Sequence, residues 1–381
     1  MSEELYKRLA KVRHYIHQHP EISEKEYETT DYIKNYLREL GIEPLDYSLK
    51  TGVVAEIGSG HPIIALRADI DALPIVEKTG LDYASENGAM HACGHDFHQT
   101  SLLGAAEILK QREGDIKGTV RLIFQPAEEN FQGGHQVIDA GGIEGVSAIV
   151  GYHNNPHLKP GQLGLRSGAI MAGVEQFEVT VKGVSAHAAR PDLGVDTVLV
   201  ITTIINNLQN IISRTVSPFQ SAVLSVTHID VGNTWNVLPA EGFFEGTIRT
   251  FDPEVRLSVI DKFTKVVQAT AEQFGAEVDI VWGNSPKVTF NDATITPLIF
   301  ENSKKFAEVL ETLPSTGGED FAAYQEKIPG VFAFVGSNGA EQAPDWHHDD
   351  FIVRDEALPV AVNYFVESAL YLLEYYGESN A

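Results

Sequence analysis

Apolar residues recur three or four positions apart near the start of the chain, which predicts amphipathic helices over Glu3–Gln18 and Tyr27–Leu40. Two short apolar runs rich in β-branched residues follow, Val53–Ile57 and Ile63–Arg67. The turn-forming residues of Gly58–Pro62 separate these runs, so we expect a β-hairpin here. In the first helix the apolar positions are Leu5, Leu9, Val12 and Ile16.

From residue 63 onward, apolar strand-like runs are each followed by acidic or imidazole residues, and helical stretches separate them. This alternation predicts an α/β domain with a mostly parallel sheet. Ligands bind outside the carboxyl ends of such strands, so the residues that follow them should converge on one edge. The predicted strands are Ile63–Leu66 before Asp69, Thr119–Phe124 before Glu128 and Glu129, Val146–Gly151 before His153, and Gly330–Gly336 ahead of His347. The predicted helices are Phe97–Arg112, His135–Ala140 and Phe321–Glu326.

The middle of the chain follows the order β-α-β-β-α-β, which is that of a ferredoxin-like α+β unit. We therefore predict an inserted domain over residues 173–287, within a discontinuous first domain made of residues 1–172 and 288–381. The elements of the insertion are predicted at Glu175–Lys182, Val195–Ile212, Ala222–Val231, Glu241–Thr250, Glu254–Phe274 and Glu277–Trp282.

Length and composition fit two globular domains. The chain has 381 residues, 43% of them hydrophobic, and exceeds one ordinary core. Its net charge of -25 argues against nucleic acid or an anionic membrane as a partner. A single cysteine excludes an intrachain disulfide and fits a reducing compartment. Because the N-terminus lacks the apolar core of a signal peptide, we expect a cytoplasmic protein.

The segment His91–His98 holds three histidines, one aspartate and the only cysteine. Thiolate and imidazole are strong ligands for zinc-like ions. Cys93 and His95 are separated only by Gly94, so a flexible loop would turn both toward one ion. The alternative is a buried structural cysteine beside hydrogen-bonded histidines.

Glu128 and Glu129 follow a predicted strand, and neighbouring side chains tend to point in different directions. One could bind a metal while the other moves protons, although two solvated surface glutamates are the common alternative. Two close ions would suit hydrolysis, because they acidify water and polarise a carbonyl, with Glu128 as general acid/base. Enough ligands for two ions, if one group bridges, are offered by Cys93, His95, Glu129, His153 and His347.

Seven motifs, in order along nearly the whole chain, resemble the amidohydrolase branch of the aminoacylase and carboxypeptidase metallopeptidase family. That branch includes hippurate hydrolases, plant auxin-conjugate hydrolases and N-acetyldiaminopimelate deacetylases. The motifs are Arg67-Ala-Asp-Ile-Asp-Ala-Leu-Pro74, Met90-His-Ala-Cys-Gly-His-Asp-Phe-His98, Phe124-Gln-Pro-Ala-Glu-Glu129, Ser185-Ala-His-Ala-Ala-Arg-Pro191, Asn236-Val-Leu-Pro239, Gly246-Thr-Ile-Arg249 and Gly318-Glu-Asp-Phe321.

The resemblance implies an amidohydrolase that cleaves an N-acyl amino acid, expected to be N-acetyl, into an amino acid and a carboxylic acid. It also implies two divalent ions per chain, which could be zinc, manganese, cobalt or nickel. Cys93 stands where related branches use a bridging Asp, and Glu128 matches the catalytic acid/base. Asp69 matches a carboxylate that supports the ligands. The ligand positions implied are Cys93, His95, Glu129, His153 and His347.

In the inserted domain, His187 resembles the histidine that reaches the other subunit's site and stabilises the tetrahedral oxyanion. Asn236 and Arg249 resemble the pair that holds the substrate's free carboxylate. The resemblance implies that this domain acts as a lid and forms a two-fold homodimer.

Three departures from the family pattern concern the site. After the glutamate pair, Asn130–His135 replaces a more Gly-rich run and is expected to line the substrate pocket. The tail motif has Asp349 where the family has Pro, and the spacing to Phe351 favours His347 over His348 as the last ligand. Asn154 and Asn155 replace an apolar-aromatic pair and are expected to line the substrate pocket.

Three other functions are compatible with the same residues. One is an exopeptidase or dipeptidase on the same scaffold, acting on short peptides. Another is a cysteine hydrolase that uses Cys93 with His95. The last is a catalytically silent binding protein, because a fold does not prove turnover.

Overall fold

The computed structural model describes residues 1–379, which form two compact units. Within the described residues, unit 1 contains residues 1–170, 289–313 and 320–379, and unit 2 contains residues 171–288 and 314–319. The domain bounds predicted from the sequence, and the lid and dimerisation roles of the insertion, stay predictions.

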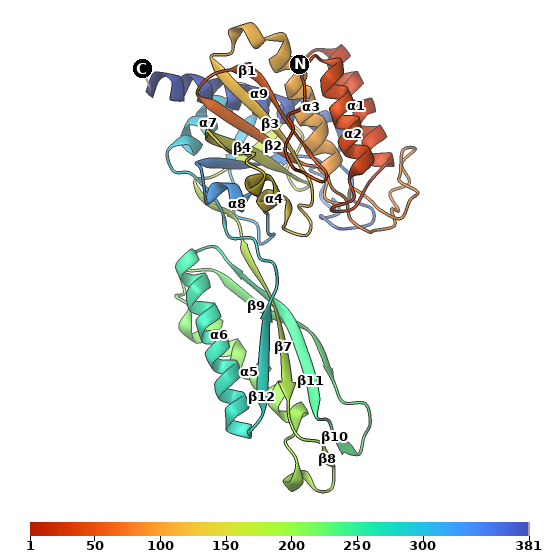
Figure 1. Ribbon diagram of the computed structural model, residues 1–381, viewed down its shortest axis with the longest axis vertical. Helices are drawn as coiled ribbons and strands as arrows, with labels where there is room; N and C mark the ends of the chain where they lie inside the picture. The colour runs from red at the N-terminus through yellow and green to blue at the C-terminus, as the bar shows by residue number, and fades with distance from the viewer. Residues whose placement is uncertain (380–381) are drawn as a thin grey trace. The chain divides into compact units, whose positions relative to one another are not determined.

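A seven-stranded sheet forms the middle of unit 1, in the order β1-β3-β2-β4-β15-β5-β14 (Figure 1). Strands β3, β2, β4 and β15 are parallel, whereas β1 and β5 pair antiparallel with their neighbours β3 and β15. The predicted α/β class with a mostly parallel sheet is confirmed. The strands are β1 (Val53–Ser59), β2 (Ile63–Asp69), β3 (Gly118–Gln125), β4 (Val146–Asn155), β5 (Gln162–Leu165), β14 (Glu308–Glu311) and β15 (Gly330–Gly336), with the shorter β6 (Gly168–Met171) and β13 (Thr289–Asn291) outside this sheet.

The hairpin predicted for the first two strands is wrong, because β3 lies between them. Val53 of β1 pairs with Phe124 on one side of β3, and Ile63 of β2 pairs with Thr119 on the other. The link between β1 and β2 therefore passes the end of β3, where the Thr119 N–H donates to the Pro62 carbonyl at 2.9 Å. Two apolar runs joined by a turn do not reveal that a third strand separates them.

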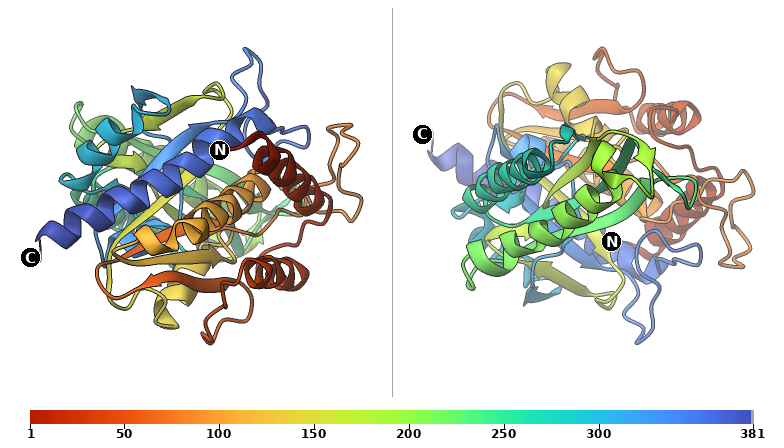
Figure 2. Two further views of the ribbon diagram at one scale, coloured as in Figure 1. Left: turned by 90° about the horizontal axis from the view of Figure 1, so that it is seen from above. Right: turned by 90° about the horizontal axis from the view of Figure 1, so that it is seen from below.

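Helices cover both faces of this sheet. Helices α1, α3 and α9 pack on one face and lie in the foreground of the left view of Figure 2. Helices α4 and α8 lie on the other face, below the sheet in Figure 1. The helices of unit 1 are α1 (Glu3–Gln18), α2 (Tyr27–Glu39), α3 (His95–Gln111), α4 (Gly133–Asp139), α7 (Ile295–Ser303), α8 (Ala322–Gln325) and α9 (Leu358–Ser379).

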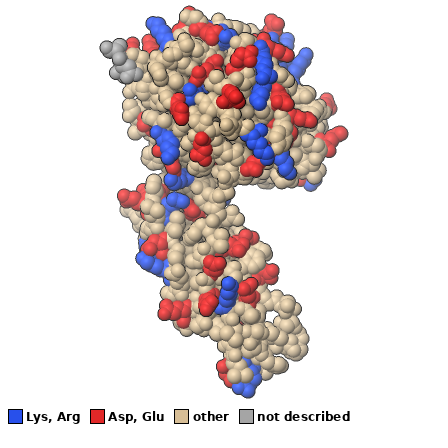
Figure 3. Space-filling view, in the orientation of Figure 1, with Lys and Arg blue, Asp and Glu red and all other residues tan. Residues whose placement is uncertain are grey.

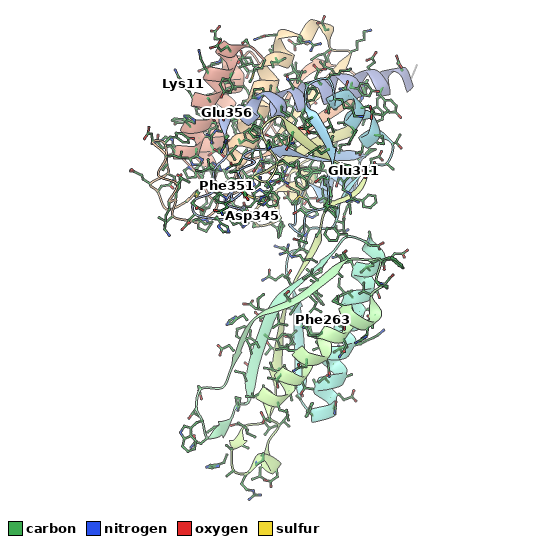
Figure 4. The ribbon with its side chains drawn as sticks, turned by 180° about the vertical axis from the view of Figure 1, so that it is seen from behind. Lys11, Phe263, Glu311, Asp345, Phe351 and Glu356 are labelled. Atoms are coloured by element: carbon green, nitrogen blue, oxygen red, sulfur yellow. The ribbon has the colours of Figure 1, made fainter. Side chains whose placement is uncertain are left out.

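Unit 2 is a four-stranded antiparallel sheet, β12-β7-β11-β9, with α5 and α6 packed on one face. The ring centroids of Phe177 and Phe263 lie 4.6 Å apart in its core, and Figure 4 labels Phe263. The order β-α-β-β-α-β along the chain confirms the predicted ferredoxin-like unit. Its elements are β7 (Gly173–Lys182), β8 (Ala186–His187), α5 (Thr197–Thr215), β9 (Ala222–Val231), β10 (Val237–Leu238), β11 (Glu241–Thr250), α6 (Pro253–Phe274) and β12 (Glu277–Trp282).

Acidic and basic side chains are interspersed over the face drawn in Figure 3. Among the described residues, no helix combines the length and the apolar character needed to span a bilayer.

Candidate metal centre

Adjacent parallel strands bring the predicted ligands to one edge of the unit 1 sheet. Strand β2 ends at Asp69, and β3 ends at Gln125, shortly before the two glutamates. His153 lies near the end of β4. Cys93 and His95 are supplied by the segment at the start of α3. His347 comes from the loop between β15 and α9, whose residues Asp345 and Phe351 are labelled in Figure 4.

Gly94 shapes the segment that carries Cys93 and His95. Its φ is +83°, and a Cβ at this position would lie 2.4 Å from Nδ2 of Asn154, so the segment requires glycine. His95 is the first residue of α3. A helix therefore holds the imidazole, in place of the flexible loop expected from the sequence.

The five predicted ligands form two groups that share Cys93. Within each group the ligand atoms lie within 4.8 Å of one another. Cys93 Sγ is 3.3 Å from His153 Nε2, and His347 Nε2 is 3.4 Å from a carboxylate oxygen of Glu129. One thiolate common to two groups is the arrangement that a pair of adjacent ions with a bridging ligand needs. The groups are Cys93, His95 and His153, and Cys93, Glu129 and His347.

Two buried polar atoms indicate that this donor set fits a cation. Among the described residues, neither His95 Nε2 nor Glu129 Oε1 has a hydrogen-bond partner, and these two atoms lie 3.9 Å apart. Leaving a buried polar group unpaired costs about 1–3 kcal/mol. A divalent cation would satisfy both atoms, and the mixed N, O and S donors around them suit transition metals.

Asp71, for which the sequence predicted no role, contacts two of the predicted ligands. Its Oδ1 lies 3.2 Å from His95 Nδ1, and its Oδ2 accepts the backbone N–H of Glu129 at 3.0 Å. A carboxylate at Nδ1 orients the Nε2 of the same ring toward a metal position. Asp69 instead lies 2.6 Å from His98 Nδ1 and accepts from Arg67 at 2.7 Å. The supporting role predicted for Asp69 stays a prediction.

Burial and local charge shift the pKa values of the cluster. Burial raises the pKa of Glu129 to about 7, an effect that His95 opposes and Asp71 strengthens. Burial lowers the pKa of His95, but the charges of Asp69 and Asp71 outweigh it and bring the value to about 10. Burial holds the pKa of His153 well below its usual range. A divalent cation would favour the carboxylate of Glu129 and the neutral imidazole of His95.

Asn154 is fully buried and does not line an open pocket, so the expectation from the sequence is wrong for this residue. Its Nδ2 donates to the Cys93 carbonyl at 2.5 Å, and its backbone N–H donates to His98 Nε2 at 2.9 Å. Its Oδ1 accepts the Ser337 hydroxyl at 3.1 Å, and its backbone carbonyl accepts Trp346 Nε1 at 3.2 Å. Asn154 thus connects the end of β4 to three other segments around the cluster.

His347 adopts a left-handed backbone with φ of +65°, an uncommon conformation for a residue other than glycine. Its N–H donates to the Ala92 carbonyl at 2.9 Å, and its side chain is 54% exposed. His348 belongs to none of the ligand groups formed by the described residues. The geometry favours His347 of the two, and its role as a ligand stays a prediction.

Glu128 lies beside the ligands and is 4% exposed. Its Oε2 is 4.0 Å from His95 Nε2, and its Oε1 is 3.4 Å from the backbone N–H of Asp320. Glu128, His95 and Glu129 also form a candidate ligand group, and this group does not include Cys93.

The three predicted site residues of unit 2 lie at two ends of its sheet. His187 pairs with Val237 in the β8–β10 ladder, and the Ala188 N–H donates to the Asn236 carbonyl at 3.0 Å. Arg249 lies near the far end of β11, where its Nη1 donates to a backbone carbonyl at 3.2 Å. The rise of a strand, roughly 3.3 Å per residue, separates Arg249 from the first residue of β11 by about 25 Å. Within one chain, Asn236 and Arg249 therefore lie at opposite ends of this sheet. Their role as a pair that holds the substrate carboxylate stays a prediction.

A family model described as peptidase family M20/M25/M40 matches residues 65–371. The chain belongs to this peptidase family. It is 47% identical to the N-acetyl-L-cysteine deacetylase of Bacillus subtilis, over 98% of this chain and 90% of that protein. It is 37% identical to the IAA-amino acid hydrolase ILR1-like 5 of Arabidopsis thaliana, over 98% and 88%.

A crystal structure of the YXEP protein of Bacillus subtilis, described as a dinuclear metal-binding peptidase from the M20 family, superimposes with a TM-score of 0.87. That chain is 43% identical, and the match covers 98% of this chain and 99% of the other. The resemblance inferred from the motifs is confirmed, and this M20 chain is an enzyme of the hydrolase class.

The structure of this M20 chain also contains a buried charged network that was not predicted from the sequence. Asp96, next to His95, lies 2.9 Å from His17 Nδ1 and 3.1 Å from Arg13 Nη1. The other nitrogen of His17 lies 3.1 Å from Glu77, in the segment between β2 and α3. The sequence signal was present, because Arg13 and His17 are four positions apart on the apolar side of α1.

His17 should stabilise the fold in a pH-dependent manner. Burial lowers its pKa, but Asp96 and Glu77 outweigh this effect and bring it to about 9, above the ordinary value of 6.5. Its contribution is therefore fully present below pH 6.5 and is lost as pH rises through 9. We expect His17→Gln to lower the free energy of unfolding at pH 6 by about 1–3 kcal/mol. Urea unfolding at pH 6 and pH 9.5 measures this, and an equal loss at both would contradict the account.

Proposed function

We propose that this chain is a dinuclear metal-dependent amidohydrolase that cleaves N-acetyl amino acids into an amino acid and acetate. The observation that carries the proposal is the pair of ligand groups sharing Cys93, with Glu128 beside them. Two relatives from Bacillus subtilis are named as deacetylases of N-acetylcysteine, and these names support acetyl as the acyl group.

In this proposal Cys93 is common to both metal positions. His95 and His153 would complete the protein ligands of one ion, and Glu129 and His347 those of the other. When bound, such ions supply Lewis acidity, which lowers the pKa of water and polarises the scissile carbonyl. Zinc, manganese, cobalt and nickel all accept these donors.

Glu128 would move the protons of the reaction. Its carboxylate would accept a proton from the attacking water and deliver it to the nitrogen of the leaving amino acid. Its position supports this role, because one oxygen lies 4.0 Å from His95 Nε2 and the other is directed to the Asp320 N–H.

His187 would stabilise the oxyanion that develops on the substrate carbonyl. Its Nδ1 accepts the Ala189 N–H at 3.0 Å, so a neutral ring carries its proton on Nε2. A preorganised donor of this kind is suited to a developing negative charge.

We further propose that the working enzyme is a homodimer, in which Arg249 of one chain and Asn236 of a second hold one substrate carboxylate. The positions of these residues support this arrangement, because Arg249 lies near the end of β11 and Asn236 lies beside the β8–β10 ladder, before β11 begins. Strand β9 is an edge of the unit 2 sheet, and its Val223 and Ile229 are 41% and 47% exposed, so it offers an apolar edge for pairing. Sedimentation should give twice the chain mass, and a fully active monomer would exclude the dimer.

Arg249→Ala should lower kcat/KM for N-acetyl amino acids by about 10–100-fold, mainly through a higher KM, because a hydrogen bond to a charged group contributes about 1.5–3 kcal/mol. The matched substrate is the amide of the same N-acetyl amino acid, which lacks the carboxylate and should lose little. Arg249→Lys keeps the positive charge but lacks the planar guanidinium fork, so its kcat/KM should lie between those of the wild type and Arg249→Ala. Unchanged kinetics on the carboxylate substrate would remove Arg249 from the site.

A substrate panel tests the function itself. The metal-loaded protein is assayed with N-acetyl amino acids and with dipeptides that share the same C-terminal amino acid. The proposal predicts the higher kcat/KM for the acetylated series. A preference for dipeptides would make the chain an exopeptidase on the same scaffold, and turnover of neither series would overturn the proposal.

A further inference from the structure

Glu26 is a buried carboxylate to which neither metal binding nor proton transfer assigns a role. It is 0% exposed, and none of the ion pairs between described residues includes it. Its Oε1 accepts the backbone N–H of Ala127 at 2.9 Å, and its Oε2 accepts the Thr51 hydroxyl at 2.8 Å. Although Glu26 directly precedes α2, its side chain does not cap that helix. An acidic group buried without a cation is costly, so its placement calls for a reason.

The partner of Glu26, Ala127, has an unusual backbone. Its φ is +54°, a left-handed conformation that costs an ordinary L-residue roughly 1–2 kcal/mol. Its N–H is the one held by Glu26, and its carbonyl accepts the N–H groups of Gln132 and Gly133 at 3.2 and 3.0 Å. Hydrogen bonds therefore fix the peptide units on both sides of Ala127.

The left-handed residue directly precedes Glu128 and Glu129, so it sets the direction in which both side chains leave the end of β3. The surrounding segment is tightly packed, because a Cβ on Gly133 would lie 1.6 Å from the Pro126 carbonyl oxygen. Rotation of Ala127 to the ordinary negative φ would redirect the chain that carries Glu128.

We propose that Glu26 is a positioning residue for Glu128 and Glu129. By holding the Ala127 N–H, it keeps Ala127 left-handed and the Glu128 carboxylate beside His95. This inference rests on the proposed hydrolytic function and deepens it.

The test is a double-mutant cycle between Glu26 and Ala127, read by kinetics in the metal-loaded protein. Glu26→Leu removes the acceptor and should lower kcat by about 10–100-fold, because a misplacement of a catalytic group by about 1 Å can cost up to about 10²-fold in rate. Glu26→Gln keeps an acceptor oxygen and should stay near wild type. Ala127→Gly adopts a left-handed φ without strain, so adding it to Glu26→Leu should restore much of the lost kcat.

Rescue by Ala127→Gly distinguishes positioning from general stabilisation, since glycine removes a side chain and adds no contact. An unchanged kcat in Glu26→Leu, or an equal loss with and without Ala127→Gly, would overturn the inference. Glu26→Asp, whose shorter side chain withdraws from the Ala127 N–H, gives the same cycle if the leucine variant does not fold.

Amide hydrogen exchange over residues 126–133 supplies a readout that needs no substrate. Faster exchange in Glu26→Leu, but not in Glu26→Gln, is expected whether or not the right substrate is known. Wild-type protein without turnover would therefore count against the proposed function, whereas exchange unaffected by Glu26→Leu would count against Glu26.

Discussion

Replacing Glu128 with glutamine is expected to lower kcat by about 10²–10⁴-fold while the metal content stays at the wild-type level. Glutamine keeps the size of the side chain and an acceptor oxygen near the Asp320 N–H, but it cannot take a proton from water at neutral pH. The loss should appear in kcat, with little change in KM, because proton transfer belongs to the transition state. Steady-state kinetics and elemental analysis of the same preparation measure both quantities.

Glu129→Gln is the matched control, because it changes the neighbouring carboxylate that belongs to a Cys93 ligand group. This variant should lose metal as well as activity. If Glu128→Gln lost metal in the same way, Glu128 would be a ligand, and the assignment of the proton-transfer role would be wrong. Full activity of Glu128→Gln would remove it from the chemistry altogether.

Cys93→Ala is expected to weaken both metal positions, because Cys93 is the member that the two ligand groups share. Alanine offers no ligand atom, so the metal content should fall well below two ions per chain and turnover should be lost. Cys93→Asp replaces the thiolate with a carboxylate, another anionic ligand for divalent ions. We expect this variant to recover metal and a substantial part of the activity.

The aspartate variant also separates metal chemistry from a cysteine hydrolase. A hydrolase that used Cys93 as its nucleophile would need the thiolate itself. Cys93→Asp that binds metal fully and yet has no turnover would favour the nucleophile and contradict the shared-ligand role.

The sequence predicted the central strands of unit 1 because their apolar runs are nearly unbroken, as buried parallel strands require. It did not predict which strands are neighbours. Strand β1 pairs with β3, which lies more than fifty residues later in the sequence, and local patterns carry no information about such long-range pairing. Helix α9 was not predicted either. Its signals were nevertheless present in the sequence, because Pro359 lies in its first turn and apolar residues then recur at helical spacing.

Some residues of the candidate site could likewise be predicted from the sequence, and others could not. Cys93 and His95 stand out because three chemistry-bearing residue types fall within one short segment. His153 and His347 stand out because each comes after a predicted strand of the parallel sheet. Asp71 could not be separated from Asp69, because the choice depends on how the chain leaves β2 and meets α3. The contacts of Asn154 and Glu26 join segments that are far apart in the sequence, so local sequence patterns could not predict them.

The most direct test of the central claim is the metal content of the purified protein, paired with hydrolysis of N-acetyl amino acids before and after chelation. The account predicts about two divalent ions per chain, loss of turnover when they are removed, and recovery when divalent metal is restored. Turnover that survives complete removal of metal, or a protein that binds no divalent ion under reconstituting conditions, would contradict it.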